Sequence, residues 1–290
     1  MNQPLSFPRL CAHRGFHMAA PENTLPAFEL ALETGAPEME LDLWPSKDGH
    51  LMVCHDPDVY RTCGVKRLIR DMTTKELRAL DAGSWFGPAF RDARLPLFEE
   101  VLELCGGKAL LNVHIKSPLE NNVQSEKLAE RDRVCDYYHD HHIPVMPPLP
   151  EGTEEILPEI ENRPWTPYSE GDFLKILSAL DACGGRDWVY ITGEADVLTT
   201  ARGLAPDLPR CCLEGYMNYT LVEHAVEYGC QRVQFTKQLT TKAMVERARA
   251  RGLICNMFWA DDVKEAAAYF EAGMDCILTN NAGPLMKELF

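Results

Sequence analysis

Acidic and apolar residues alternate in the stretch from Glu38 to Leu43. On a β-strand, successive side chains point to opposite faces, so Glu38, Glu40 and Asp42 would share one face. Neighbours on one face lie roughly 7 Å apart, which lets the carboxylate oxygens of Glu40 and Asp42 reach one hard divalent cation. The alternation would also suit a half-exposed edge strand, so this pattern alone leaves that interpretation open.

Two histidines bracket this acidic stretch, and each follows a short apolar run. His13 comes directly after Leu10–Ala12, and His55 comes directly after Leu51–Cys54. A single histidine at the end of a strand is more often structural than catalytic. Because imidazole titrates near neutral pH, two of them around one acidic pair favour general acid and base catalysis at one scissile bond.

Several short motifs follow one another along the chain. They are His13-Arg14-Gly15, Pro21-Glu22-Asn23-Thr24, Glu40-Leu41-Asp42, Lys47-Asp48-Gly49 and His55-Asp56. In order and spacing, this series resembles the glycerophosphodiester phosphodiesterases, and the resemblance resumes at Thr62–Gly64, at Leu111–Lys116 and near the end of the chain. The resemblance implies a metal-dependent enzyme that cleaves a glycerophosphodiester, or a related small phosphodiester, to an alcohol and glycerol phosphate.

The same resemblance implies roles for individual residues. His13 and His55 would be the catalytic acid and base, and the assignment of each role stays open. Arg14 and Lys116 would hold phosphate oxygens, the first through its planar guanidinium and the second as a point charge. Phe258 would form an apolar wall of the substrate pocket. The nucleophile would be either water or a hydroxyl of the substrate.

The expected metal ligands are Glu40, Asp42 and a residue on the next barrel strand. In the family pattern that strand ends Glu-x-Lys, but this chain reads His114-Ile115-Lys116. The resemblance implies magnesium or calcium. A neutral histidine removes one negative charge from the site, which favours manganese, zinc or iron.

Three outcomes for the metal site stay open at this level. His114 could itself be the third ligand. Glu194 or Glu214 could supply a replacement carboxylate from a later strand end. The third possibility is a site that binds little metal and has little activity.

Strand-like and helical segments alternate along most of the chain. The expected strands are 9–12, 37–43, 109–115, 188–192, 210–214, 232–235, 253–258 and 276–279, and helical patterns include 24–34, 97–104, 172–182, 221–228, 241–251 and 263–272. Eight such units in one chain of this length predict a closed parallel (β/α)8 TIM barrel, whose site lies at the carboxyl ends of the strands. His13, Asp42, Lys116 and Thr279 all fall at such ends.

Two segments interrupt this alternation within a single predicted domain, residues 1–290. Residues 57–95 follow the second strand unit and predict a small inserted subdomain at the mouth of the barrel. Residues 117–171 are rich in proline and predict a long excursion. His139-Asp140-His141-His142 lies inside it, and a solvated turn is a better interpretation of this run than a metal cluster.

Glu38 would lie inside the barrel, below Glu40. A buried carboxylate needs a partner or a proton. Asn112, or a basic residue on a neighbouring strand, would serve as that partner.

The formal net charge of -15 and the absence of a basic run argue against nucleic acid as a partner. The apolar runs are too short to span a bilayer, so stable membrane insertion is not expected. Eleven scattered cysteines without a CxxC pair fit reduced thiols in the cytoplasm. The oligomeric state stays open. The rival functions are a phospholipase D-like or cyclising lipid phosphodiesterase, and a barrel that binds metal or phosphodiester without catalysis.

Overall fold

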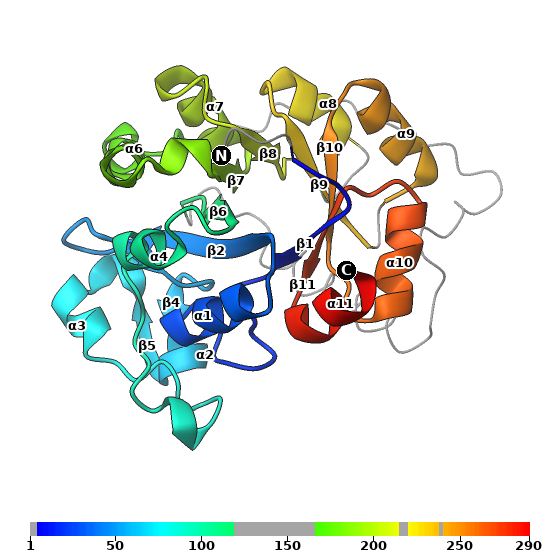
Figure 1. The fold of residues 1–290 in the computed structure, drawn as a ribbon. Helices are drawn as coiled ribbons and strands as arrows, with labels where there is room; N and C mark the ends of the chain where they lie inside the picture. The colour runs from blue at the N-terminus through cyan, green and yellow to red at the C-terminus, as the bar shows by residue number, and fades with distance from the viewer. Residues whose placement is uncertain (1–4, 119–165, 215–219, 238–239) are drawn as a thin grey trace.

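The computed structural model of the chain describes residues 5–118, 166–214, 220–237 and 240–290 (Figure 1). Its main sheet has nine strands among these residues, and eight of them run parallel. The eight are β1 (Arg9–Ala12), β2 (Glu38–Pro45), β6 (Leu110–Ile115), β7 (Val189–Gly193), β8 (Arg210–Cys212), β9 (Arg232–Thr236), β10 (Ile254–Phe258) and β11 (Cys276–Thr279). Because β1 pairs with both β11 and β2, the sheet closes on itself. The predicted TIM barrel is therefore confirmed.

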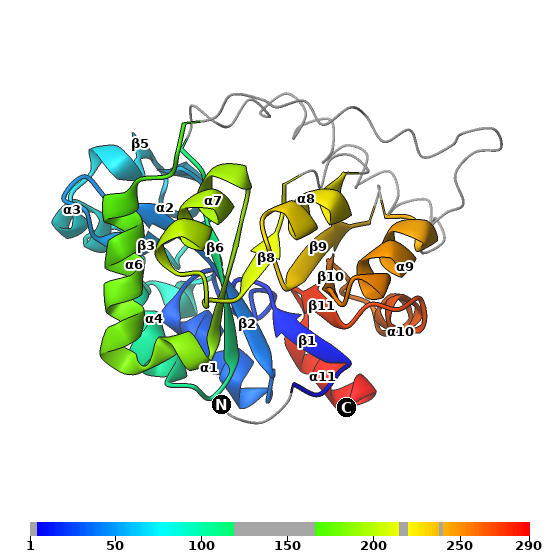
Figure 2. The same cartoon turned by 90° about the horizontal axis from the view of Figure 1, so that it is seen from above.

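Helices surround the ring of strands (Figure 2). The longer ones are α1 (Leu25–Glu33), α4 (Phe98–Cys105), α6 (Glu170–Cys183), α7 (Ala195–Leu204), α8 (Leu221–Glu227), α9 (Lys242–Ala250), α10 (Val263–Glu271) and α11 (Ala282–Leu289). The predicted strands are all present, with bounds that differ by at most two residues from those expected. The tract from His139 to His142 and most of the proline-rich excursion lie outside the described residues.

The alternation in β2 separates two environments. Met39, Leu41 and Leu43 are fully buried between the sheet and the helices, in a core that also contains Phe28 of α1 and Phe98 of α4. Strand geometry then directs Glu38, Glu40 and Asp42 to the opposite face, which is the lumen of the barrel. The interpretation of this segment as an exposed edge strand is wrong, because β2 pairs with β1 on one side and with β6 on the other.

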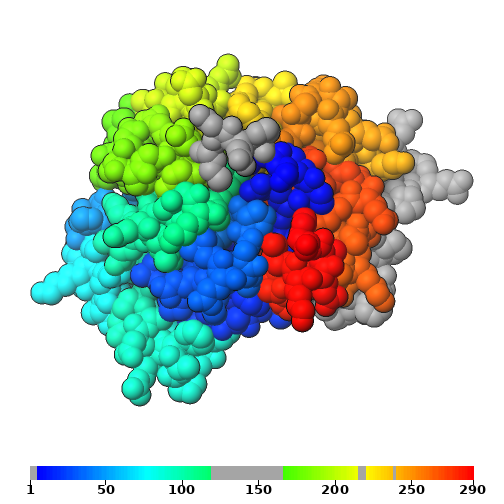
Figure 3. All heavy atoms as spheres, viewed as in Figure 1, coloured from blue at the N-terminus to red at the C-terminus, as the bar shows by residue number. Residues whose placement is uncertain are grey.

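The segment after β2 forms a small layer beside the barrel. It contains β3 (Leu51–Val53), β4 (Asp58–Val59), α2 (Tyr60–Cys63), β5 (Val65–Leu68) and α3 (Thr74–Arg78). Strand β3 is antiparallel to the end of β2, and β4 pairs with β5 in a separate sheet. An apolar cluster of its own includes Trp44, Met52, Val59, Ile69 and Leu77. Figure 3 shows this segment, in cyan, at the left edge of the surface. Its status as an inserted subdomain stays a prediction.

Glu38 lies at the bottom of the lumen and is fully buried. Its Oε1 lies 2.6 Å from Arg9 Nε on neighbouring β1, and its Oε2 lies 3.2 Å from Arg232 Nη1 on β9. The Tyr190 hydroxyl donates to Oε2 at 3.2 Å. The expected basic partner on a neighbouring strand is therefore confirmed. Asn112 is not that partner, because its Oδ1 instead accepts a hydrogen bond from Thr192.

Within the described ranges, no helix combines the length and the apolar character that crossing a membrane requires.

Candidate active site

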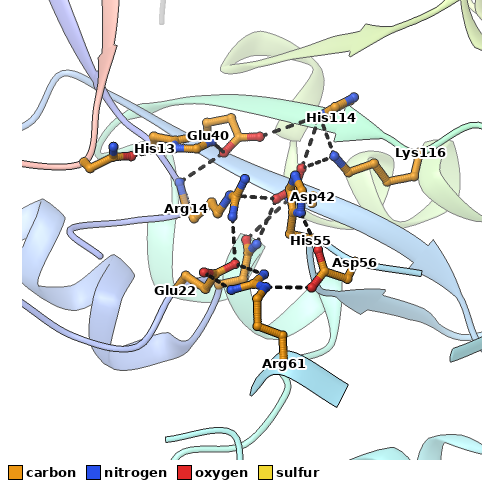
Figure 4. Close-up of polar contacts among 12 residues, drawn as sticks. His13, Arg14, Glu22, Glu40, Asp42, His55, Asp56, Arg61, His114 and Lys116 are labelled. Carbon is orange, nitrogen blue, oxygen red and sulfur yellow. Dashed lines mark hydrogen bonds and ion pairs between the residues drawn. The ribbon is translucent and has the colours of Figure 1, made fainter. Parts of the chain in front are cut away.

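Three side chains with metal-ligating atoms converge at the carboxyl ends of β2 and β6. Glu40 and Asp42 are buried in the lumen, and Asp42 is the register partner of His114 on β6. One ligand atom from each of the three lies within 4.8 Å of the others, and they form the one such group among the described residues. Figure 4 shows Glu40 and Asp42 with His114 beside them.

The charges around these three groups are unevenly distributed. Lys116 Nζ lies 2.8 Å from Asp42 Oδ1, and His114 Nδ1 lies 3.1 Å from the same oxygen and 3.9 Å from Glu40 Oε1. Burial, reinforced by repulsion from Asp42, raises the pKa of Glu40 well above its usual range. Although burial opposes ionisation of Asp42, the Lys116 charge and the contact with His114 hold the pKa of that carboxyl well below its usual range. The acid pair therefore favours one proton or one cation between its members.

These residues fit a divalent metal ion. Two carboxylates and one imidazole meet at Asp42 Oδ1, and all three are groups that ligate divalent cations. Burial, followed by the charge of Lys116, lowers the pKa of His114 to about 4. The imidazole is therefore neutral at pH 7, as a nitrogen ligand must be.

His13 occupies the side of the lumen next to β11. Its Nδ1 lies 2.7 Å from Oδ1 of Asn280, and its Nε2 lies 3.8 Å from Oε2 of Glu40. The ring of Phe258 contacts the imidazole edge-on at 4.9 Å between centroids. Burial, followed by the charge of Arg14, lowers the pKa of His13 well below its usual value.

His55 lies on the other side of the acid pair, after β3. Its Nδ1 lies 2.7 Å from Oδ1 of Asp56, and its side chain keeps about a third of its surface exposed. Burial of the ring, followed by the charges of Lys116 and Arg14, lowers the pKa of His55 to about 4. Both imidazoles are therefore neutral at pH 7 before an anion binds, and a bound phosphate would raise both pKa values.

Arg14 is positioned by its own backbone and by Glu22. The residue has φ of 55°, a left-handed conformation, and its amide donates to Glu40 Oε2 at 3.0 Å. Its Nη1 donates to Glu22 Oε1 at 2.9 Å. The next residue must be glycine, because a Cβ on Gly15 would lie 2.6 Å from the backbone carbon of Ala27.

Arg61, from helix α2 in the segment after β2, bridges Glu22 and Asp56. Its guanidinium donates two hydrogen bonds to Glu22, at 2.6 and 2.8 Å, and its Nε donates to Asp56 Oδ2 at 2.7 Å (Figure 4). Although burial opposes ionisation of Glu22, Arg61 and Arg14 lower the pKa of that carboxyl to about 2. A row of alternating charges thus extends from Arg14 through Glu22, Arg61 and Asp56 to His55.

The structure brings most of the predicted site residues together. His13, Arg14, Glu40, Asp42, His55, His114 and Lys116 meet at one end of the barrel, and Phe258 lies against His13. Neither Glu194 nor Glu214 belongs to the metal-ligating group. Oε2 of Glu214 instead accepts a hydrogen bond from the Ala195 amide, at the start of α7.

Five supporting residues received no role from the sequence, and one of them is Asn280, which holds the His13 ring. Glu22, Asn23 and Asp56 fall inside the motifs already noted, so the motifs located them without showing what they bind. The Asn23 side-chain amide donates to Asp42 Oδ2 at 2.8 Å. No sequence pattern indicated a role for Arg61, because its three hydrogen bonds depend on how the segment after β2 packs against the barrel.

Residues 13–142 match the family described as the glycerophosphoryl diester phosphodiesterase family. This match covers somewhat less than half of the chain. It is 48% identical over 107 residues to a glycerophosphodiester phosphodiesterase of Caldanaerobacter subterraneus, a match that covers 37% of this chain and 44% of that protein. It is 37% identical over 125 residues to a glycerophosphodiester phosphodiesterase of Bacillus subtilis, which covers 40% of this chain and 43% of that protein. The chain thus spans less than half the length of these curated relatives.

Solved structures of family members share the fold over nearly the whole chain. A phosphodiesterase of Oleispira antarctica, in complex with the product sn-glycerol-3-phosphate, superimposes with a TM-score of 0.74 at 20% identity, over 98% of this chain and 97% of that one. A glycerophosphodiester phosphodiesterase of Agrobacterium tumefaciens gives 0.69 at 21% identity, over 96% and 99%. At this level of identity the likeness establishes the barrel alone.

Proposed function

We propose that this chain hydrolyses glycerophosphodiesters to glycerol phosphate and an alcohol. The observation that carries the proposal is the position of two neutral imidazoles on opposite sides of one buried acid pair. The named activity of the relatives and the product bound by the Oleispira antarctica enzyme support the same reaction class.

The phosphate would lie between Arg14 and Lys116. The guanidinium can hold two phosphate oxygens at once, while the ammonium neutralises charge as a point donor. Both cations already face Asp42, with Lys116 Nζ at 2.8 Å and Arg14 Nε at 3.6 Å. A phosphodiester bound here therefore has positive charge on two sides of the phosphorus.

The proton transfers would use His13 and His55. One imidazole removes a proton from the attacking group, which is either water or a hydroxyl of the substrate, and the other protonates the oxygen of the departing alcohol. Each ring is held through Nδ1, His13 by Asn280 and His55 by Asp56, so that Nε2 is the nitrogen available for chemistry in both. Asp56 would also stabilise His55 in its charged form.

Glu40, Asp42 and His114 would hold the divalent metal ion. When bound, such an ion neutralises negative charge that develops on the phosphate oxygens. Two carboxylates and one imidazole form a mixed oxygen and nitrogen site, which suits manganese, zinc or iron better than calcium.

A phosphodiester assay tests the proposed function. The purified chain is incubated with glycerophosphodiesters of several alcohols, with each of magnesium, calcium, manganese and zinc supplied in turn. Release of free alcohol together with glycerol phosphate is the expected result. Lipid phosphodiesters are supplied in parallel. Cleavage of these lipids alone would favour the lipid phosphodiesterase, and binding without turnover would favour the non-catalytic barrel.

Changing His114 to glutamate tests its role as a metal ligand. The added carboxylate raises the negative charge of the site, so His114→Glu is expected to shift the ratio of magnesium to manganese affinity toward magnesium by roughly tenfold. Calorimetric titration of the metal-free protein measures both affinities. His50→Glu is the matched control, because it makes the same change at an exposed histidine. An unchanged ratio in His114→Glu would argue against a ligand role.

Arg61 is a positioning residue whose replacement tests the charge row. Arg61→Gln leaves Glu22 and Asp56 without their shared cation, so kcat is expected to fall roughly tenfold or more. The freed charge of Asp56 would raise the pKa of His55, and the acidic limb of the kcat/KM profile would move to higher pH. Arg67→Gln, which breaks one exposed ion pair in the same segment, is the control. A fall in kcat without a shift of the limb would indicate only a packing role.

A further inference from the structure

A small apolar cavity borders the site at the end of β2 and β6. Its volume is about 130 Å³, and its wall includes Trp44, Pro45, Pro57, Lys116, Pro118 and Tyr168. Most of these residues present rings and methylene groups. The polar group closest to the catalytic residues is the Lys116 ammonium, which is already paired with Asp42 at 2.8 Å. Arg70, Ser169 and Asp172 also line the cavity, and Asp172 is paired with Lys175 at 2.8 Å. The wall therefore combines a mostly apolar surface with a few polar groups.

Two residues of this wall contact residues of the proposed active site directly. Lys116, a proposed phosphate ligand, forms part of both the wall and the site. The indole Nε1 of Trp44 donates to the carbonyl oxygen of His55 at 3.1 Å. The cavity and the phosphate position thus share a boundary on the side of His55.

Tyr168 is a fixed part of this wall. It keeps 4% of its surface exposed and packs in the apolar core that also contains Phe173 of α6 and Val197 of α7. Its position beside the cavity is therefore held by the packing of the helices against the barrel.

Size limits the occupant. An engineered apolar cavity of about 150 Å³ in another protein stays dry and binds benzene. The cavity beside Lys116 is of nearly the same volume. It would accept a six-membered ring or a short branched alkyl group, whereas a long acyl chain would not fit inside it.

We propose that this cavity binds the apolar part of the alcohol that is esterified to the phosphate. The inference rests on the proposed function and names its substrate class: glycerophosphodiesters whose alcohol carries a ring-sized apolar group. The glycerol phosphate half would lie in the lumen, and the apolar half would extend past Lys116.

A matched pair of substrates tests this class. The first is the diester of glycerol phosphate with benzyl alcohol, and the second is the diester with a second glycerol. Burial of a phenyl group corresponds to a preference of about tenfold to a hundredfold. We expect kcat/KM for the benzyl diester to exceed that for the diglycerol diester by this factor. Equal values, or a preference for glycerol, would overturn the assignment.

Substitutions in the wall test whether the preference for the benzyl diester arises in this cavity. Pro45→Leu places a longer side chain in it and is expected to remove most of the benzyl preference while leaving turnover of the diglycerol diester unchanged. Tyr168→Ala enlarges the cavity and should favour a naphthylmethyl diester. Tyr269→Ala removes a buried tyrosine from α10, far from this wall, and serves as the control for stability. A benzyl preference that survives Pro45→Leu would contradict the assignment even if Tyr168→Ala does not fold.

Binding separates this inference from the proposed function. If neither diester is cleaved, the proposed function fails. Whether the cavity binds an apolar group is then decided by the affinities of benzyl phosphate and methyl phosphate, measured by calorimetry. Benzyl phosphate binding about tenfold tighter, with the difference abolished by Pro45→Leu, would support the apolar site, and equal affinities would overturn it.

Discussion

Replacing either His13 or His55 by alanine is expected to lower kcat for glycerophosphodiester hydrolysis by about 10²–10⁴-fold, the usual contribution of a general acid or base. Each imidazole lies close to the acid pair, held by Asn280 or Asp56, and alanine leaves no proton carrier in its place. The measurement is steady-state kinetics on variants with wild-type circular dichroism. His50→Ala, at an exposed position, should keep full activity.

The leaving group distinguishes the two roles. A p-nitrophenyl diester needs little help from an acid, because nitrophenolate departs without a proton. The variant that lacks the acid should therefore regain much of its activity on this substrate, while the variant that lacks the base should not. Full activity of either alanine variant on glycerophosphodiesters would remove that histidine from the mechanism.

Replacing Glu38 by glutamine is expected to lower the free energy of unfolding by about 3–5 kcal/mol. The carboxylate is fully buried and lies between Arg9 and Arg232. Glutamine keeps the shape but leaves two guanidinium groups in the lumen without a counter-charge. Denaturant unfolding with linear extrapolation measures the change.

An exposed ion pair provides the matched control. Glu246 lies 3.8 Å from Lys242 on the surface of α9, and Glu246→Gln should change the free energy of unfolding by less than about 1 kcal/mol. If Glu38→Gln is no more destabilising than this control, the negative charge of Glu38 does not stabilise the barrel.

The barrel could be predicted from the sequence because its strands have strong local patterns. The run from Met39 to Leu43 is apolar on alternate residues, and those residues do face the helices. The carboxyl-end positions of His13 and Lys116 followed from the same reasoning. When parallel strands form a closed ring, residues at their carboxyl ends lie at the same end of the barrel, so no knowledge of individual contacts is needed to place them together.

Contacts that form only when the barrel closes could not be predicted in this way. Arg232 is separated from Glu38 by 194 residues, and it reaches that carboxylate across the lumen. Arg61 belongs to a segment whose packing against the barrel has no periodic signal. The pattern for Glu38 therefore required a basic partner, but it could not indicate that one would come from β9.

The hydrogen bond between His13 and Asn280 joins residues 267 positions apart. During synthesis, the His13 imidazole leaves the ribosome long before the amide that orients it, and β1 has no β11 to pair with until that strand emerges. A nascent chain therefore carries almost all of the candidate site residues while it lacks the closed ring that aligns them. The candidate site is assembled only once β11 has been synthesised.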